Sequence, residues 1–469
     1  MLRKSLIFIM VFALIAAWLQ PIYSVKANGA DGPKQIISSS GSSFVILPDG
    51  SLWGWGLNDR GQLGDGSSTD RHSPIHIMDD VIAVNSNLNN TLAITSDNTL
   101  WIWGRNMYEQ PLEEGVLDQY VPTRLLDDVV YVVSTRNNIM VIRTDGSLWS
   151  AGVNAHSQLG RDVENPLRHY FGKVMDDVAS VALGTTHALA IKNDGSLWTW
   201  GANIVGQLGD GTTIERSEPV HIKDNVAVVS ANSVSSVAVT TDNRLWFWGY
   251  DTLRAFPHDG DPLSRPVITS PTLVEIHEGE ITSVSLGGGR GSFIMVTLQD
   301  GGLVSWGTNS LGQLGDGSGV SFRSVERIKD DVASVAGSEA TVLAMTGDGV
   351  LWAWGLNESG AVGDNSTTDR PMPVMIMDGL TSPDTLQIPD TDTADSEENE
   401  DSNDSNQDDL EALSDEYPEQ EYDENNDESE EPSEGLNLES VLLVAGVIFI
   451  AILLIAILIV AYFVIKQSR

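Results

Sequence analysis

One short stretch of sequence recurs through three quarters of the chain. Its clearest copy, residues 193–212, reads NDGSLWTWGANIVGQLGDGT. Successive copies lie 48 residues apart, except for one gap of 49 and one of 58. The residues that open the copies are Asp49, Asp97, Asp145, Asp194, Asp242, Asp300 and Asp348. Repetition at this period is typical of a solenoid, a propeller or an array, so the chain contains seven similar units.

Each unit has the pattern of a set of β-strands. The unit around the clearest copy contains apolar runs separated by turn residues, at 178–183, 188–191, 197–200 and 219–222. The pair Asp194-Gly195 predicts a tight hairpin turn of the primed type, whose central residues need positive φ. No helical period of 3.6 residues competes in this region. About four strands per unit is the number found in a propeller blade.

The tryptophans support closure of these blades into a ring. Only Trp18 of the 13 lies outside the repeated units. A single blade is too small to bury its own apolar face, so large flat side chains should pack between neighbouring blades. We expect this structural role for Trp53, Trp55, Trp101, Trp103, Trp149, Trp198, Trp200, Trp246, Trp248, Trp306, Trp352 and Trp354.

Glycine-rich loops follow three of the tryptophan boxes. They read GQLGDG at residues 61–66, 206–211 and 312–317. With the boxes, these loops resemble the repeats of the regulator of chromosome condensation family. The resemblance covers residues 34–378 and implies an all-β, seven-bladed propeller. It does not define a function, because propellers host unrelated activities.

The two ends of this domain should meet. Residues 35–49 resemble the first half of a repeat, and residues 373–377 resemble its last strand. An unpaired edge would expose backbone donors and acceptors. We therefore predict that residues 373–377 lie beside residues 35–38.

Residues 1–27 have the pattern of a signal peptide. Arg3 and Lys4 precede an apolar core at 6–18, and small residues such as Ala27 follow. This pattern predicts a short helix and export of the domain. An uncleaved anchor is the alternative, and it delivers the domain to the same side of the membrane.

Residues 384–440 differ completely in composition. The part up to Glu434 holds 23 Asp and Glu residues and no Lys or Arg. Such a segment cannot form a core and predicts a disordered, extended stalk. Weak calcium binding at Asp390, Asp392 and Asp395 stays open, although the spacing lacks the Gly and the final Glu of a calcium loop.

Residues 441–465 form a run of 25 residues without a charge. This length is sufficient for one transmembrane helix. Basic residues follow in the tail 466–469, and acidic residues precede the run. The positive-inside rule therefore places the tail in the cytoplasm and the propeller outside, on a single-pass membrane protein.

The charge excludes nucleic acid as a partner. The formal net charge is −40, and without the 24 acidic residues between Asp384 and Glu439 it is still −16. An acidic domain repels phosphate backbones. The chain has no Cys, which excludes disulfides, zinc–cysteine sites and thiol catalysis. An exported chain without disulfides fits a bacterial envelope better than an animal cell surface.

The sequence offers no catalytic or metal-binding constellation and no cofactor motif. None of the eight His residues forms a helical metal-ligand pair. His76 and His221 occupy equivalent places in their units, which favours positions on strands. The repeated Asp65, Asp210 and Asp316 are best explained as turn formers.

Irregular loops are the candidate binding elements, because recognition commonly uses loops on a rigid scaffold. The fifth unit replaces the GQLGDG loop by residues 250–270, where the long gap also falls. The candidate contact residues are Tyr250, Arg254, Phe256, His258 and Arg265. A tolerated insertion without a ligand is the alternative.

Three functions remain open. The first is a non-enzymatic, membrane-tethered module that binds a protein or an envelope polymer. The resemblance also implies two others. One is inhibition of an extracellular enzyme, since a secreted β-lactamase inhibitor has this type of propeller. The other is guanine-nucleotide exchange, which the export signal and anchor oppose.

Overall fold

The structure is a computed structural model that describes residues 35–105, 118–163, 169–254, 266–276, 279–288, 292–321 and 326–378. The predicted signal peptide, acidic stalk, transmembrane segment and tail all lie outside the described residues. In the described part every regular secondary-structure element is a β-strand. This part contains no helix that is long and apolar enough to cross a membrane.

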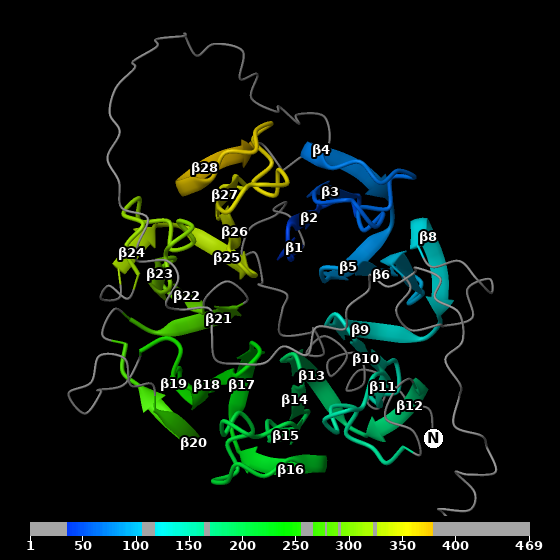
Figure 1. The fold of residues 1–469 in the computed structure, drawn as a ribbon, viewed down its shortest axis with the longest axis vertical. Coiled ribbons are helices and arrows are strands. Elements are labelled where there is room, and N and C mark those ends of the chain that lie inside the picture. Colours follow the sequence, from blue (N-terminus) through cyan, green and yellow to red (C-terminus); the bar gives the residue numbers. More distant parts are fainter. Residues whose placement is uncertain are drawn as a thin grey trace, which may run out of the picture. The chain divides into compact units, whose positions relative to one another are not determined.

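The 28 strands form seven antiparallel four-stranded sheets, each built from four consecutive strands (Figure 1). The first strands lie nearest the centre: β1 (Gln35–Ser38), β5 (Val81–Ser86), β9 (Val129–Ser134), β13 (Val178–Leu183), β17 (Val226–Ala231), β21 (Ile281–Gly287) and β25 (Val332–Gly337). The second strands are β2 (Ser42–Ile46), β6 (Asn90–Thr95), β10 (Asn138–Arg143), β14 (His187–Lys192), β18 (Ser235–Thr240), β22 (Phe293–Leu298) and β26 (Thr341–Thr346). The third strands are β3 (Leu52–Gly56), β7 (Leu100–Arg105), β11 (Leu148–Gly152), β15 (Leu197–Gly201), β19 (Leu245–Tyr250), β23 (Leu303–Gly307) and β27 (Leu351–Gly355). The outer strands are β4 (Arg71–Met78), β8 (Asp118–Leu126), β12 (His169–Met175), β16 (Arg216–Lys223), β20 (Val267–Val274), β24 (Glu326–Lys329) and β28 (Arg370–Met377).

The sheets are the seven blades of a closed propeller, so the predicted fold class is confirmed. Each inner strand contacts the inner strand of the next blade, and β25 of blade 7 contacts β1 of blade 1. Seven separate apolar clusters form the core, one at each seam between two blades. This arrangement follows from the alternating apolar pattern, because each blade has two faces to cover and only a neighbouring blade can cover them.

The predicted pairing of the two ends is wrong. Outer strand β28 pairs with β27, and inner strand β1 pairs with β2, so neither end completes the other's sheet. Blade 1 and blade 7 each consist of one continuous segment. The ring therefore closes by packing and by loop contacts, not by exchange of a strand.

The hairpin turns also differ from the predicted primed type. In blade 4, Lys192 N–H donates to Ser196 O, which leaves three residues in the loop. Of these only Gly195 has a positive φ, at 81°. This is the three-residue hairpin loop, in which a residue with positive φ follows a type I turn. Asp194 stabilises it, because its carboxylate accepts hydrogen bonds from the backbone N–H and the hydroxyl of Ser196.

The Trp-Gly pairs mark points of close backbone approach. Gly201 has a φ of 102°, and a Cβ at this residue would lie 2.5 Å from the carbonyl oxygen of Thr186. No other residue fits without movement of the adjoining hairpin.

Candidate binding surfaces

The antiparallel strands give the propeller two different ends. The turn between the first and second strands and the loop between the third and fourth lie at one end, which we call the loop face. The Asp-Gly turns and the links between blades lie at the other end, which we call the turn face. The first described residue, Gln35, and the last, Asp378, both lie at the turn face.

The GQLGDG loops on the loop face are built around an asparagine and an aspartate. In blade 1 the Asn58 amide donates to Asp65 at 3.0 Å, and the Asn58 oxygen accepts from Leu63 N–H at 2.9 Å. Asp65 also forms an ion pair with Arg71. Partial burial would raise the pKa of Asp65, but hydrogen bonds from Arg71, Ser67 and Asn58 lower it below its usual value. The same arrangement recurs around Asp210 and Asp364. The prediction that Asp65, Asp210 and Asp316 form turns is confirmed, since each accepts the backbone N–H two residues later.

Each of these loops reaches over the next blade. In the first seam, the carbonyl oxygen of Gln62 accepts the indole N–H of Trp103 and the hydroxyl of Thr91, both at 2.8 Å. Trp248 and Ser236 donate to Gln207 in the same way between blades 4 and 5. The loop thus acts as an interblade clasp that uses both lone pairs of one carbonyl.

The predicted tryptophans occupy two positions. Fully buried in the seams are Trp55, Trp103, Trp200, Trp248 and Trp354, and Trp306 is 6% exposed. Half-buried nearer the turn face are Trp53, Trp101, Trp149, Trp198, Trp246 and Trp352. Several of this second set are covered by cations, as Lys223 covers Trp246 and Lys329 covers Trp352. His76 and His221 contact Trp53 and Trp198 at equivalent strand positions, as predicted.

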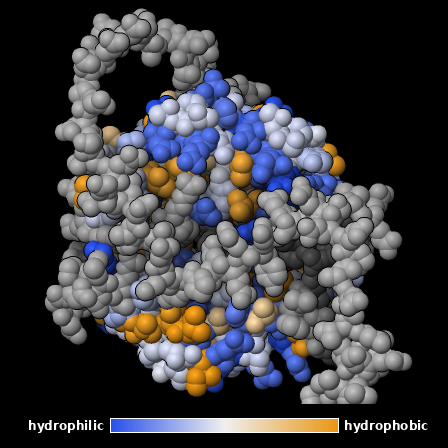
Figure 2. All heavy atoms as spheres, in the orientation of Figure 1, coloured by the Kyte–Doolittle hydropathy of each residue, from blue (hydrophilic) through white to orange (hydrophobic). Residues whose placement is uncertain are grey.

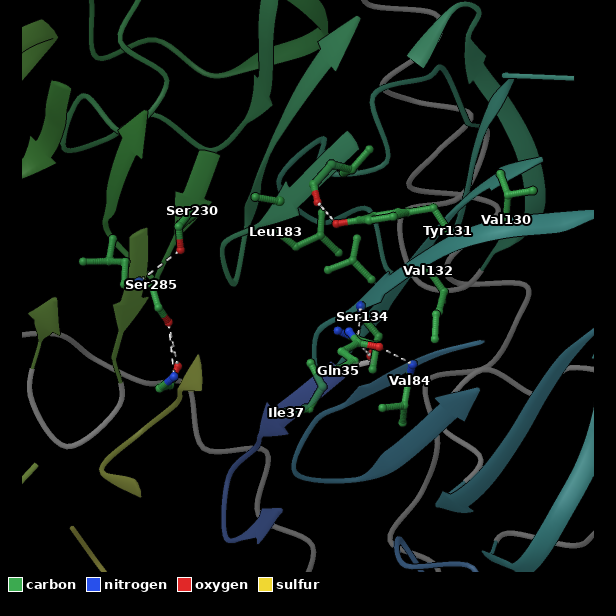
Figure 3. A pocket seen from close by; sticks show the side chains of 18 of the residues that line it. Gln35, Ile37, Val84, Val130, Tyr131, Val132, Ser134, Leu183, Ser230 and Ser285 are labelled. Atoms are coloured by element: carbon green, nitrogen blue, oxygen red, sulfur yellow. Dashed lines mark hydrogen bonds between the residues drawn. The ribbon is translucent and has the colours of Figure 1, made fainter. Parts of the chain in front are cut away.

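All seven inner strands line a central cavity of about 330 Å³ (Figure 3). Its polar groups bind the neighbouring blade. Gln35 accepts from Val84 N–H at 2.9 Å, and Ser230 accepts from Leu286 N–H at 3.1 Å. Tyr131 donates to Val181 O. These bonds occupy polar groups along the inner edges of the blades, and the cavity is lined by both apolar and polar side chains.

The turn face is strongly acidic. Most links between blades contain an Asp-Asp pair whose second residue has positive φ, for example Asp80 at 61° and Asp177 at 63°. The first residue pairs with a basic side chain three positions earlier, as in His76–Asp79, Arg124–Asp127, Lys173–Asp176 and Arg327–Asp330. His221–Asp224 is the same pair in the link Asp224-Asn225. Such exposed pairs contribute about 0–1 kcal/mol each. The second Asp of these links and the Asp of each hairpin turn add further carboxylates, so this face is negative.

Exposed apolar side chains are concentrated at the other end. Among the described residues, eight of the eleven exposed large hydrophobic side chains lie at the loop face or where the outer strands begin beside it: Tyr120, Val121, Tyr170, Ile204, Ile214, Val267, Val320 and Met372. On the side drawn in Figure 2, hydrophobic groups form separate patches among hydrophilic ones. Single exposed apolar residues are common on soluble proteins, and contiguous apolar patches mark protein-binding surfaces. The loop face is therefore the end of the propeller with more apolar groups available to a partner.

The predicted binding loop is only partly described. Tyr250 ends β19 and is half-buried, and its carbonyl oxygen accepts the Ser235 hydroxyl at 2.6 Å. Arg254 has a φ of 52°. Asp251 N–H donates to Pro266 O, so the two sides of this loop join beside blade 5. Phe256, His258 and Arg265 lie outside the described residues.

The described residues contain no group of three or more His, Asp or Glu side chains that could hold a metal ion. His187 is fully buried, and desolvation lowers its pKa to about 3. Its Nε2 lies 2.9 Å from the Ser236 hydroxyl. Since that hydroxyl donates to Gln207 O, His187 is the donor and is neutral. It is a structural group at the seam of blades 4 and 5.

Sequence reasoning did not identify the organising asparagines or the clasp hydroxyls. Asn58, Asn203, Asn309 and Asn357 each follow a Trp-Gly pair at the same distance, and this repetition was the available signal. The hydroxyls of Ser43, Thr91 and Ser236 give no such signal, because their partners lie in another blade.

Comparisons with known proteins agree with this architecture. Residues 49–90 and 194–239 match a model of the regulator of chromosome condensation (RCC1) repeat, and residues 178–207 match a second model of that repeat. No curated protein sequence matches the chain.

Solved structures show the same fold. Human WBSCR16 is similar at 22% identity and a TM-score of 0.61, over 69% of this chain and 93% of that one. Yeast RCC1 (Prp20), solved with Kap60, is similar at 18% identity and a TM-score of 0.60, over 72% and 85%. Prp20p of Saccharomyces cerevisiae, described with its binding properties to Gsp1p and histones, gives 18% and 0.60, over 72% and 88%. This chain therefore carries RCC1 repeats, folded into a seven-bladed propeller.

Proposed function

We propose that this chain is an exported, membrane-anchored protein of bacterial type whose propeller binds a protein or an envelope polymer through its loop face, without catalysing a reaction. The observation that carries this proposal is the contrast between the two ends of the propeller. Exposed apolar side chains such as Ile204 and Met372 lie at the loop face, whereas the turn face is acidic. An apolar set of groups on rigid loops fits a protein partner better than a charged ligand.

The chain termini favour the same assignment. The segments before Gln35 and after Asp378 both leave the propeller at the turn face. The sequence after Asp378 holds the acidic stretch and the apolar run of 25 residues. A tether that begins at this end leaves the loop face clear of its own attachment point, so that a partner can reach it.

Inhibition of an extracellular enzyme is a second candidate and would use the same loop face, because recognition commonly uses loops on a rigid scaffold. Guanine-nucleotide exchange is supported only by a shared fold at 18% identity, and a fold does not define a function.

Two experiments test the proposal. Protease added to intact cells should release the propeller by cutting between Asp378 and the apolar run. A propeller that is protected from the protease would contradict the location outside the membrane.

The second experiment compares pull-downs from envelope extracts. Ile204→Glu combined with Met372→Glu should lose the partner that the unchanged protein retains. Met375→Glu is the matched control, because Met375 is exposed on the same outer strand but nearer the turn face. Retention of the partner by the double variant would contradict the loop-face assignment.

A further inference from the structure

Five outer strands carry a proline at one equivalent position. Each proline directly precedes the residue that pairs with the middle of the third strand, as Pro74 precedes Ile75, the partner of Gly54. The five are Pro74, Pro122, Pro219, Pro271 and Pro373. Proline has no N–H and blocks the addition of another strand, which is a common protection of sheet edges.

Blade 3 lacks this protection. In its outer strand β12, Phe171 stands where five of the six other blades have proline, directly before Gly172, the partner of Ser150. The bulge is also smaller. Two residues of β12 stand opposite Ala151, whereas three residues of β4 stand opposite Trp55. In blade 6 the sequence has Val325 at this position, directly before Glu326, so proline is absent there too. Residue 325 lies outside the described residues, and β12 is therefore the described edge that lacks the proline.

The unprotected edge is held in place from within its own blade. The Arg161 guanidinium donates to Tyr170 O at 2.8 Å and to the Ser150 hydroxyl at 3.2 Å. Gly172 leaves room for it, because a Cβ there would lie 2.6 Å from the guanidinium carbon. The edge is therefore ordered before any partner arrives, which lowers the entropy cost of strand pairing.

The side chains of β12 are compatible with pairing. Tyr170 is 70% exposed, and β12 lies on the outer rim of the ring (Figure 1). Its one described cation, Lys173, is already paired with Asp176 at 2.6 Å. The edge thus offers backbone groups and an aromatic ring without an uncompensated charge.

We propose that two copies of this chain associate edge to edge through antiparallel pairing of β12 with β12. An antiparallel edge is complementary to itself about a two-fold axis. Centred on Gly172, this pairing sets Tyr170 opposite Val174 and Phe171 opposite Lys173 of the second copy. Aromatic–aliphatic and cation–aromatic pairs across strands are favourable, and no lysine faces a lysine.

This contact is independent of the partner proposed for the loop face. One strand pair buries less than the roughly 1,200–2,000 Å² of a stable dimer. The association is therefore weak and depends on concentration.

Cross-linking of cysteine variants tests the contact, because the full chain has no Cys of its own. Lys173→Cys places a thiol near the proposed axis. Arg124→Cys is the matched control, since Arg124 holds the equivalent position on β8 and also pairs with an Asp three residues later. With a short bis-maleimide, the full-length Lys173→Cys chain should give several times more dimer than Arg124→Cys.

Two further variants separate backbone pairing from packing. Phe171→Pro in the Lys173→Cys chain should abolish the dimer, because it restores the block present in five other blades. Phe171→Ala removes the same ring but keeps the N–H, so it should retain the dimer. Equal cross-linking at both cysteines overturns the proposal. So does a dimer that persists in a folded Phe171→Pro chain, or a strictly monomeric mass by sedimentation at the highest concentration.

Discussion

The indole N–H of Trp55 in blade 1 donates a hydrogen bond of 2.9 Å to the carbonyl oxygen of Ala361 in blade 7. The Ser43 hydroxyl donates to the same oxygen at 2.7 Å. This arrangement repeats the clasp of Trp103 and Thr91 on Gln62 between blades 1 and 2. The seam that closes the ring is therefore chemically the same as an internal seam.

Replacement of Trp55 should weaken that closing seam. Trp55→Phe removes the indole donor and leaves a cavity in a fully buried site, at a cost of about 2 kcal/mol. Trp53→Phe is the control, because Trp53 is half-buried and bonds only to Ser51 of its own turn. Its cost should stay below about 1 kcal/mol. Denaturant unfolding measures both, and equal losses would contradict the clasp.

Loss of charge inside a clasp loop should also be costly. Asp364 is mostly buried and accepts hydrogen bonds from Arg370, Ser366 and Asn357. Asp364→Asn leaves Arg370 without its counter-ion, and we expect a loss of about 1–3 kcal/mol. Asp176→Asn on the exposed Lys173 pair should cost less than about 0.5 kcal/mol. A thermal unfolding midpoint that is the same in both variants would refute this difference.

Acidification should destabilise the propeller through His187. The folded-state pKa of His187 is about 3, and its unfolded value is about 6.5. Between these values the unfolded chain binds a proton that the folded chain does not. Stability is therefore complete above about pH 6.5 and falls by about 1.4 kcal/mol per pH unit below it.

The variant His187→Asn tests this pH dependence. Asparagine occupies the equivalent position in blades 2 and 3, at Asn90 and Asn138, so the fold should accept it. Stability measured from pH 6.5 to 4.5 should become flatter. The clasp aspartates do not interfere, because their lowered pKa values affect stability only as the pH falls below about 4. An unchanged slope would contradict the buried neutral state.

Glycine replacements should separate backbone strain from steric overlap. Both glycines have positive φ, 102° at Gly201 and 79° at Gly146. The Cβ of Gly201→Ala would overlap the Thr186 carbonyl oxygen, whereas a Cβ at Gly146 would have no atom within 4 Å. Gly146→Ala should therefore cost only the strain of positive φ, about 1–2 kcal/mol. Gly201→Ala should cost clearly more or prevent folding. Similar unfolding midpoints for the two variants would show that the hairpin can move aside.

The sequence alone predicted the repeated part of this protein. Seven boxes at a nearly fixed spacing define seven blades, and strands such as β13 and β15 begin where the apolar runs begin. These features are local, because turn residues and strand alternation act over a few neighbouring positions. The acidic and apolar segments beyond Asp378 are also evident from composition.

Only the tertiary structure decided how the ring closes. The sequence analysis paired residues 373–377 with residues 35–38, whereas Trp55 and Ser43 meet Ala361 instead. The sequence also did not show that Phe171 stands at the position of an edge proline. The bulge in β12 is one residue shorter than in β4, so the two strands align only once their pairing with the third strand is known. The clasp contacts between blades join residues 29 to 318 positions apart. Nothing in a local pattern specifies which carbonyl a distant indole or hydroxyl will reach.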